Sequence, residues 1–404
     1  MSTRLLYHAF CIRGYTVVKE SFENGRVFFT IEGNRNELRC PVCNCRDVIL
    51  RGFRTRRFRT LPIGSRPVYV LLDVPRVGCR QCGCVRQVPA KFAESRRSYT
   101  KAFERHVLEL SQQMTIQDVA KHLTVCWDVI KEIQKRNLQK KYKHIRLKDL
   151  RQIAIDEIAI GRGHRYITVV MDLRSGAVVF VGDGKGADAL IPFWKRLKCA
   201  RAKIEAVAMD MSPAYISAVK ASLPKATIVF DHFHVIKMFN DKLAQLRRDL
   251  YHEATTKLKK NILKGTRWLL LKNPENLDDT RDEAKRLQQA LELNQPLATA
   301  YYMKEDLRQI WNQADKQSAR RLLLDWIYRA EVCGIRMLMK FAKTLAKHFH
   351  GILSFYDYRI STGPLEGTNT KIRVLQHRAY GFRDMEFFKL KILALHEAKI
   401  KLVG

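Results

Sequence analysis

Two Cys-x-x-Cys pairs constrain the fold of this chain more than any other feature of its sequence. Cys40-Pro-Val-Cys43 and Cys79-Arg-Gln-Cys82 each let a tight turn aim two sulfur atoms at one cation. Two such turns, joined by a pair of strands, would close a tetrahedral site of four thiolates. Because four thiolates leave no open position for a substrate, we predict that Cys40, Cys43, Cys79 and Cys82 hold a structural zinc ion.

The other cysteines leave one choice open. Cys45 and Cys84 each follow a pair closely, so either could replace one of the four zinc ligands. The alternative, buried structural cysteines without a metal, fits the spacing less well. Four more cysteines are scattered in apolar contexts and are expected to be buried thiols: Cys11, Cys126, Cys199 and Cys333. Paired clusters of this kind are typical of metal binding in a reducing compartment, not of disulfides.

The net charge of the chain indicates a polyanionic partner. Lys and Arg total 74 against 40 Asp and Glu, which gives +34 at pH 7. A solvated basic surface is the alternative, but so large an excess would destabilise a compact state that has no counter-charge to bind. No apolar run is long enough to span a bilayer, and Arg4 and Arg13 interrupt the apolar residues that a signal peptide would need. We therefore expect a soluble intracellular protein with no membrane partner.

The pattern of apolar residues changes along the chain and predicts a multi-domain α/β protein. Residues 1–97 have strand-and-turn character and form the zinc-binding module, and residues 98–148 are helical. Short apolar runs alternate with helical spacing over 149–236, and this core resumes at 357–404. Residues 237–356 between them are almost wholly helical.

Within this plan, five strands and several helices can be placed from the sequence. The strands are expected at 153–155, 166–172, 177–181, 206–209 and 226–230. Helices are expected at 188–198 and 213–222, and a final helical stretch at about 365–400. Breaks in the long helical segment are expected near Gly265 and at Asn273-Pro274.

A basic, aromatic stretch separates the two cysteine pairs. Phe53 and Phe58 are interleaved with arginines there, which is a plausible pattern for a strand that contacts phosphates. The candidate DNA-binding residues in this stretch are Arg54, Arg56, Arg57 and Arg59. A solvated basic strand is the alternative.

Residues 115–133 have the pattern of a helix-turn-helix. Thr115 and Thr124 each stand where a helix N-cap would, with a side-chain oxygen able to accept an orphan amide proton. The expected inner faces carry Val119, Ala120 and Leu123 on the first helix and Ile130 and Ile133 on the second. The second helix would enter the major groove, so Lys121 and Lys131 are candidate DNA contacts. An ordinary helical hairpin is the alternative, and the net charge and the adjacent zinc module favour DNA binding.

Three acidic residues, far apart in the sequence, are candidates for one metal site. Asp156 follows the strand 153–155, and because consecutive strand residues point to opposite faces, Glu157 cannot join the same site. Asp210 stands at the carboxyl end of another strand, where ligand sites gather in α/β sheets. Glu366 follows Gly363-Pro364 near the start of a helix. A single acidic residue at such a position is more often a helix cap than a ligand. The prediction of a metal site therefore rests on the three residues together. Asp172 is explained as a turn residue.

Four blocks resemble the ISL-three family of bacterial insertion-sequence transposases. The first three are Asp156-Glu-Ile-Ala-Ile-Gly-Arg-Gly-His-Arg-Tyr166, Val207-Ala-Met-Asp210-Met-Ser-Pro-Ala-Tyr215 and Asp231-His-Phe-His234. The fourth is Ser361-Thr-Gly-Pro-Leu-Glu366-Gly-Thr-Asn369, which is followed by Arg378-Ala-Tyr-Gly-Phe382. The zinc module and the helix-turn-helix precede these blocks in the family's order, so the resemblance covers nearly the whole chain.

The resemblance implies a ribonuclease H-like catalytic domain with a large helical insertion at 237–356. It implies a DDE transposase in which Asp156, Asp210 and Glu366 hold catalytic Mg²⁺ or Mn²⁺, the ions that hard carboxylate oxygens favour. A supporting role falls to Asp231 and His234.

Basic residues after Glu366, namely Lys371, Arg373 and Arg378, could hold the scissile phosphates, although a solvated helix face is the alternative for each. The implied partners are the element's terminal inverted repeats and target DNA, bound by a homo-oligomer in a synaptic complex. The implied location is the bacterial cytoplasm, in association with the nucleoid.

Three other functions compete with this interpretation. A catalytically inert DNA-binding regulator would keep the zinc and helix-turn-helix modules but would not need three carboxylates. A ribonuclease H-like nuclease acting on RNA or on junctions would not need the two N-terminal modules. A packaging protein would explain the charge but not the carboxylates or the order of the strands.

Overall fold

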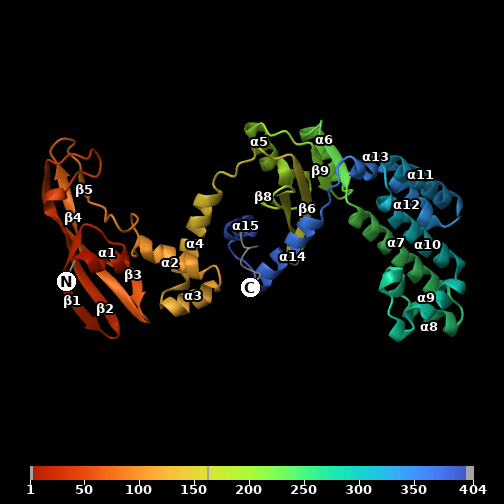
Figure 1. Cartoon of the computed structure of the whole chain (residues 1–404), viewed down its shortest axis with the longest axis horizontal. Coiled ribbons are helices and arrows are strands. Elements are labelled where there is room, and N and C mark those ends of the chain that lie inside the picture. The colour runs from red at the N-terminus through yellow and green to blue at the C-terminus, as the bar shows by residue number, and fades with distance from the viewer. Residues whose placement is uncertain (1–2, 162, 397–404) are drawn as a thin grey trace. The chain divides into compact units, whose positions relative to one another are not determined.

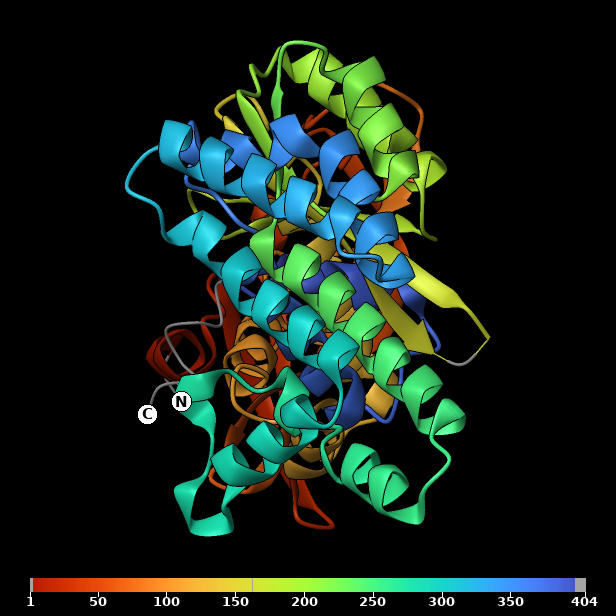
Figure 2. The ribbon, with the colours of Figure 1, turned by 90° about the vertical axis from the view of Figure 1, so that its right-hand side faces the viewer.

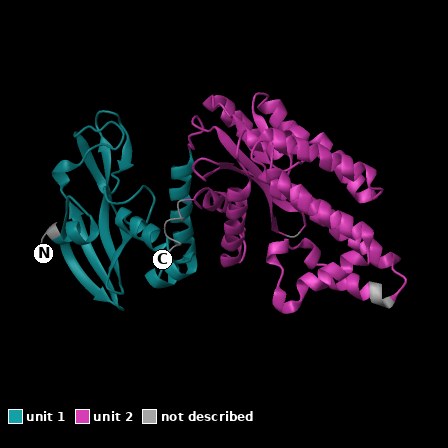
Figure 3. Cartoon of the chain, turned by 45° about the vertical axis from the view of Figure 1, so that its right-hand side comes forward, with its two compact units in different colours: residues 1–143 teal, residues 144–404 magenta. Residues whose placement is uncertain are grey.

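The computed structural model describes residues 3–161 and 163–396. The chain forms two compact units, Met1–Lys143 and His144–Gly404, which Figure 3 shows in different colours. The finer division into four parts stays a prediction, and residues 397–404 of its last part lie outside the described residues. In that range of described residues, no helix has both the length and the apolar composition that crossing a membrane would require.

The first unit begins with helix α1 (Thr3–Phe10) and a five-stranded sheet (Figure 1). Its strands are β1 (Tyr15–Glu23), β2 (Arg26–Gly33), β3 (Val48–Ile63), β4 (Arg66–Cys79) and β5 (Val85–Gln87). They are ordered β1-β2-β4-β3, with β5 paired to β4; β2 and β4 run parallel and the other pairs antiparallel. Along β4 the residues alternate between buried and half-exposed or exposed, because successive side chains point to opposite faces. Val68, Val70 and Leu72 thereby pack in one core with Phe58 of β3.

Three helices complete this unit: α2 (Lys101–Leu110), α3 (Ile116–Leu123) and α4 (Trp127–Tyr142). The predicted inner faces are confirmed, since Val119, Ala120, Leu123, Ile130 and Ile133 are all buried in one cluster. Thr115 is confirmed as an N-cap: its hydroxyl accepts the N–H of Asp118 at 3.2 Å.

The prediction that Thr124 is an N-cap is wrong. Thr124 is the C-cap of α3, in a left-handed conformation at φ 51°, and α4 begins only at Trp127 after an N-cap without a side-chain hydrogen bond. The chain uses Thr124 to end the first helix: the N–H groups of Thr124 and Val125 both reach the carbonyl of Ala120.

The second unit is built on a mixed sheet in which four strands coincide closely with the predicted ones, while the strand predicted at 153–155 extends to Gly161 and includes Asp156. The strands are β6 (Gln152–Gly161), β7 (Arg165–Asp172), β8 (Val178–Asp183), β9 (Ala206–Met209) and β10 (Thr227–Phe230). The order is β10-β9-β6-β7-β8; β6, β7 and β8 form an antiparallel meander, while β9 and β10 run parallel to β6.

Helices cover both faces of this sheet. On one side, apolar residues of α5 (Ile191–Ala200) and α6 (Pro213–Ser222) pack against Ile153, Ile155 and Val207. On the other side, α14 (Gly363–Arg378) and α15 (Met385–Leu393) pack against Ala154, Ile158 and Ala208. The stretch predicted as one final helix is thus divided into α14 and α15, and α14 lies along the face of β6 from which the even-numbered residues project.

The segment between β10 and α14 is helical, as predicted. Its main helices are α7 (His232–Glu253), α8 (Lys257–Gly265), α9 (Glu283–Glu292), α10 (Gln295–Gln309), α11 (Lys316–Val332), α12 (Arg336–Lys347) and α13 (Phe349–Leu353). The predicted breaks are confirmed, because α8 ends at Gly265 and a short 3₁₀ turn begins at Pro274. Figure 2 shows α7 in green beside α10 in cyan. Their core contains the rings of Phe239, Trp326 and Phe341 at edge-to-face geometry, and the indole N–H of Trp326 donates to the Met303 carbonyl at 2.7 Å.

The scattered cysteines differ from expectation. Cys11, Cys126 and Cys199 are exposed and Cys333 is half-buried, so none of the four is the buried thiol that its apolar sequence context suggested. Each lies at or next to the end of a helix, where one side of the residue is open to solvent.

Candidate zinc site, DNA-binding helices and carboxylate site

The two cysteine pairs lie in two turns of the same construction. In each turn the N–H of the first cysteine donates to a carbonyl five residues on, Cys40 to Cys45 and Cys79 to Cys84, both at 2.9 Å. Each turn also contains a residue with positive φ, Asn44 at 60° and Gly83 at 67°, which Asn and Gly tolerate best. The antiparallel pairing of β3 with β4 places Val48 opposite Cys79 and so brings the turns together.

The predicted zinc ligands form one cluster. The sulfur atoms of Cys40, Cys43, Cys79 and Cys82 all lie within 4.8 Å of one another. A tetrahedral site with Zn–S bonds of about 2.3 Å requires sulfur atoms roughly 3.8 Å apart, so these side chains fit a zinc ion. Without a metal the thiols of this cluster perturb one another: hydrogen bonding from the Cys43 N–H is the main cause that lowers the pKa of Cys40 to about 6, whereas the hydrogen bond from the Cys45 N–H is outweighed by desolvation and the neighbouring thiols, which raise the pKa of Cys43 to about 12.

Cys45 and Cys84 are placed differently from the four ligands. The Cys45 sulfur accepts the N–H of Asp47 at 3.3 Å. The Cys84 sulfur lies 3.3 Å from those of Cys40 and Cys82 but does not belong to the mutually close set. The geometry therefore favours the two Cys-x-x-Cys pairs as the ligands.

Arg59 is buried, unlike the other arginines of its strand. Arg54 and Arg57 are exposed, and Arg56 is half-buried with its guanidinium donating to the Arg97 carbonyl at 2.7 Å. Arg59 is only 6% exposed and donates to the carbonyl of Val68 at 3.2 Å and to that of Leu123, at the end of α3, at 3.1 Å.

The guanidinium of Arg59 also stacks near the rings of Tyr69 and Phe103, and burial lowers its pKa. The structure therefore does not support a phosphate contact by Arg59: this side chain instead joins the zinc-bearing sheet to the helix-turn-helix.

The two lysines predicted on the helix-turn-helix differ in exposure. Lys121 is exposed on α3. Lys131 is half-buried on α4, with its ammonium 5.5 Å from the ring of Trp127, the exposed first residue of that helix. The N-terminal end of α4 therefore presents an aromatic ring and a cation together.

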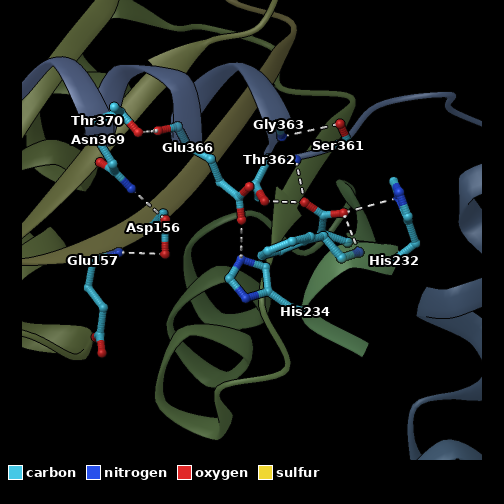
Figure 4. Close-up of polar contacts among 12 residues, drawn as sticks. Asp156, Glu157, His232, His234, Ser361, Thr362, Gly363, Glu366, Asn369 and Thr370 are labelled. Carbon is cyan, nitrogen blue, oxygen red and sulfur yellow. Dashed lines mark hydrogen bonds and ion pairs between the residues drawn. The ribbon is translucent and has the colours of Figure 1, made fainter. Parts of the chain in front are cut away.

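Asp156 and Asp210 are brought together by strand register. β6 and β9 are parallel, with Ala154 opposite Ala208, so Asp156 and Asp210, each two residues further on, stand at the same height on neighbouring strands and on the same face. The side chain of Glu157 points away from those of Asn369 and Glu366 (Figure 4). On that opposite face its carboxylate accepts the hydroxyl of Tyr215 at 3.3 Å. The choice of Asp156 over Glu157 thus agrees with the geometry of the strand.

Glu366 reaches the same face from the first turn of α14 (Figure 4). Its carboxylate lies 3.8 Å from Nε2 of His234, which projects from the first turn of α7. Burial is the main cause that raises the pKa of Glu366, and the carboxylates of Asp231 and Asp156 are close enough to raise it further, while His234 opposes them.

The Asp156 carboxylate is held at both oxygens. Oδ1 accepts the N–H of Glu157 at 2.8 Å and Oδ2 accepts Nδ2 of Asn369, one turn beyond Glu366, at 2.7 Å. Burial raises the pKa of Asp156, the neighbouring Asp210 adds to the increase, and His234 and both hydrogen bonds oppose it. Asp156, Asp210 and Glu366 therefore share one electrostatic environment.

The three carboxylates are grouped less tightly than the zinc-site cysteines. Among the described residues, only the four zinc-site cysteines have ligand atoms all within 4.8 Å of one another, so the three carboxylates are not as tightly grouped. In a two-ion site the ions are about 3.5–4 Å apart and each lies about 2.0–2.1 Å from its ligand oxygens. Ligand oxygens on the far sides of the two ions can therefore be about 8 Å apart. Hard carboxylate oxygens are the donor set that Mg²⁺ and Mn²⁺ prefer, so the residues present fit such a pair.

Asp231 is 2% exposed and links two elements of this site. Its carboxylate accepts the N–H of Phe233 at 3.0 Å as the N-cap of α7, and it also accepts the N–H of Thr362 at 2.9 Å and the Thr362 hydroxyl. Hydrogen bonds from His232 and Thr362 outweigh burial and lower the pKa of Asp231 well below its usual range.

The basic residues of α14 are distributed around the helix. Arg373 follows Glu366 by two turns and so lies on the same side, whereas Lys371 and Arg378 point elsewhere. Arg373 and Arg378 are exposed and Lys371 is half-buried.

Sequence reasoning gave no role to Thr362 or Asn369. Both stand in the block around Glu366, and the only signal for Asn369 was its place one helical turn after that residue.

Three family models match consecutive parts of the chain. A family model described as a transposase matches residues 153–392, one described as the zinc-finger of transposase IS204/IS1001/IS1096/IS1165 matches 37–82, and one described as the helix-turn-helix domain of transposase family ISL3 matches 87–136.

Two relatives resemble most of the chain. The transposase for insertion sequence element IS1001 of Bordetella parapertussis is 34% identical, over 88% of this chain and 88% of its own length. The transposase for insertion sequence element IS1557 of Mycobacterium tuberculosis is 31% identical, over 83% of this chain and 80% of its own length. A chain of the Drosophila P element transposase strand transfer complex is 10% identical with a TM-score of 0.40, covering 76% of this chain and 94% of its own.

These findings define a transposase with a zinc finger and a helix-turn-helix ahead of its transposase domain. The chain belongs to transposase family ISL3. The zinc-finger match and the four-cysteine cluster together support a structural zinc ion, and the helix-turn-helix match supports DNA binding.

Proposed function

We propose that this transposase is a DDE enzyme that binds the ends of its insertion sequence and catalyses metal-dependent DNA cleavage and strand transfer. The observation that carries the proposal is the parallel register of β6 with β9, which when continued puts Asp156 next to Asp210. The helix α14, which contains Glu366, packs against the same face of the sheet. The charge of Asp156 also interacts with those of Asp210 and Glu366, although the three are widely separated in the sequence, and a DNA-binding regulator without catalysis would not require such a group.

The reaction would consist of two displacements at phosphorus. In the first, a water oxygen attacks the phosphodiester at the element's end, and the bond to the 3′-oxygen breaks to leave a 3′-hydroxyl and a 5′-phosphate. In the second, that 3′-hydroxyl attacks a phosphodiester of target DNA and displaces its 3′-oxygen. No covalent link between protein and DNA is needed.

The side chains of the site divide this work among themselves. Bound divalent ions would activate the attacking oxygen and neutralise charge at the phosphorus. Asp156, held at both oxygens, would hold such ions together with Asp210 and Glu366. Asp231 and His234 would support Glu366 from α7, and the exposed Arg373 on its side of α14 would hold phosphate oxygens.

The sheet supports a ribonuclease H-like assignment for the catalytic domain. An antiparallel meander of β6, β7 and β8, extended by parallel β9 and β10 on the other side of β6, is the strand arrangement we associate with that fold. Residues 237–356 would then be a helical insertion between the second and third carboxylates. A homo-oligomer that holds two element ends in the cytoplasm, at the nucleoid, completes the proposal.

A strand-transfer assay tests the proposal directly. The substrate is duplex DNA carrying the inverted repeats that flank the gene, with supercoiled plasmid as the target and Mg²⁺ as the ion. Asp156→Asn, Asp210→Asn and Glu366→Gln should each reduce product at least a hundredfold. Glu157→Gln is the matched control, since it alters the adjacent carboxylate on the opposite face and should retain most activity. Undiminished strand transfer by Asp156→Asn would contradict the assignment, and binding of the repeats without cleavage by the native protein would favour the regulator.

A further inference from the structure

One face of α14 lies along β6 and carries a regular stripe of four residues. Leu365, Asn369, Ile372 and Gln376 follow one another at spacings of four, three and four, so they project from the same side of the helix. Leu365 and Ile372 are fully buried in the cluster that contains Ala154 and Ile158 of β6. The two polar members of the stripe therefore face the same strand as the two apolar ones.

Each polar member donates a hydrogen bond to β6. Asn369 Nδ2 reaches Asp156 Oδ2 at 2.7 Å, and Gln376 Nε2 reaches the carbonyl of Ile160 at 3.1 Å. Ile160 lies at an irregularity in the pairing of β6 with β7, between Ala159 and Gly161. Gln376 thus anchors the far end of the helix to backbone, whereas Asn369 alone acts on a carboxylate of the candidate active site.

The hydrogen bond that the Asn369 side chain donates explains why an amide is buried at this position. The side chain is 7% exposed, and its Oδ1 is buried without a hydrogen-bond partner among the described residues. An apolar residue of the same size would avoid burying that oxygen, so packing alone does not explain an asparagine here. Because an ionised carboxylate only accepts hydrogen bonds, the nitrogen must be the atom that faces Asp156.

We propose that Asn369 is a positioning residue that fixes the Asp156 carboxylate in the orientation that binds the catalytic metal. With Oδ1 on the Glu157 N–H and Oδ2 on Asn369, the carboxylate has one orientation, and each oxygen keeps a lone pair for a metal ion. Glu366 lies one turn before Asn369 on the same helix. The hydrogen bond from Asn369 to Asp156 therefore also fixes the position of the Glu366 carboxylate along the helix axis relative to Asp156. The inference rests on the proposed function.

Binding of Mn²⁺ to the full-length protein, followed by the electron paramagnetic resonance signal of the free ion, tests this role without DNA. Asn369→Leu keeps the volume and removes the donor, and Asn369→Ala leaves room for a water. Both should weaken Mn²⁺ affinity about tenfold or more, as loss of a hydrogen bond to a metal ligand usually does. Gln376→Leu removes the other hydrogen bond between α14 and β6 and should leave the affinity within about twofold.

The possible results separate this inference from the proposed function. Native affinity in Asn369→Leu, with an unchanged melting temperature, would overturn the positioning role. An equal loss in Gln376→Leu would overturn it too, because it would show that loosening of α14 is the cause. Equal Mn²⁺ binding by the native chain and Asp156→Asn would contradict the metal site of the proposed function itself.

Discussion

The carboxylate of Asp231 accepts hydrogen bonds from both the backbone N–H and the hydroxyl of Thr362, although 131 residues separate the two in the sequence. Asp231 ends β10 and caps α7, and Thr362 immediately precedes α14. The position of Glu366, in the first turn of α14, therefore depends on a carboxylate outside the predicted catalytic triad.

Replacing Asp231 with Asn should destabilise the second unit and misplace Glu366. Hydrogen bonds to a buried charged acceptor are lost or weakened, at a cost of about 2 kcal/mol, and strand transfer should fall at least tenfold. Urea unfolding and the strand-transfer assay measure the two effects. Asp241→Asn, an exposed change on the same helix, is the control. A variant with native stability would show that the link to Thr362 is unimportant.

The contribution of Asp231 should depend on pH in a defined direction. Its folded-state pKa is lowered from 3.8, so its ionised form is stabilised by folding. That stability is fully present above pH 3.8 and is lost as the pH falls through the lower, folded-state pKa. Asp231 also raises the pKa of His232, whose contribution is present below pH 6.5 and is lost as the pH rises through its folded-state pKa, so the difference in unfolding free energy between the native chain and Asp231→Asn should be largest at about pH 5 to 6, decline at higher pH and shrink again below about pH 4. A difference that vanishes by pH 6 would contradict this.

Asp156 should behave in the opposite way in metal-free protein. Burial and the nearby Asp210 raise its folded-state pKa above 3.8, so ionised Asp156 destabilises the fold at neutral pH. Asp156→Asn should therefore increase the free energy of unfolding at pH 7, while abolishing catalysis. The gain should disappear below pH 3.8, where Asp156 is protonated in both states. Thermal melting in EDTA across this range checks it, and a destabilised variant at pH 7 would refute it.

Removing zinc should unfold the cysteine-bearing part of the first unit. Cys40→Ser and Cys82→Ser should each lower the zinc content, which we expect to be about one ion per chain, and remove that part's melting transition. Cys199→Ser, which changes an exposed cysteine of the second unit, should keep the metal. Elemental analysis and calorimetry measure both. Full zinc occupancy in Cys82→Ser would point to Cys84 as the fourth ligand.

Arg57 and Arg59 should have separate effects on DNA binding and on stability. Arg57 is exposed, and if it contacts a phosphate, Arg57→Ala should reduce the slope of log affinity against log salt by about 0.9. Arg59→Met should leave that slope unchanged but cost about 2 kcal/mol, because the carbonyls of Val68 and Leu123 lose their donor. Fluorescence anisotropy and urea titration measure the two. The opposite pattern would restore Arg59 as a DNA contact.

Much of the architecture could be predicted because local patterns determine it. The apolar runs bounded by turn residues gave the five strands of the second unit, and the Cys-x-x-Cys spacing gave a cluster that β3 and β4 close. Asp156 and Asp210 could be proposed together because each comes directly after an apolar run, although β6 continues past Asp156 to Gly161 and only Asp210 follows its strand.

The remainder depended on contacts between distant residues. Nothing in the local sequence distinguishes Arg59 from Arg57, and only the packing of Phe103 and the end of α3 buries one of them. Thr124 is a residue type favoured at an N-cap and disfavoured in the left-handed conformation that it adopts at the end of α3, so its local preference pointed to the wrong helix end. Asn369 acquires its role only through a strand more than 200 residues earlier.

The Asp231–Thr362 contact also has a topological consequence. The chain leaves the sheet at Asp231 and returns to it at Thr362, so the helical segment between them begins and ends at the same point of the fold. This helical segment could become longer or shorter, or be replaced, without a shift of α14, provided that Asp231 and Thr362 are retained. Selection could therefore remodel these helices for new tasks while the position of Glu366 stayed the same.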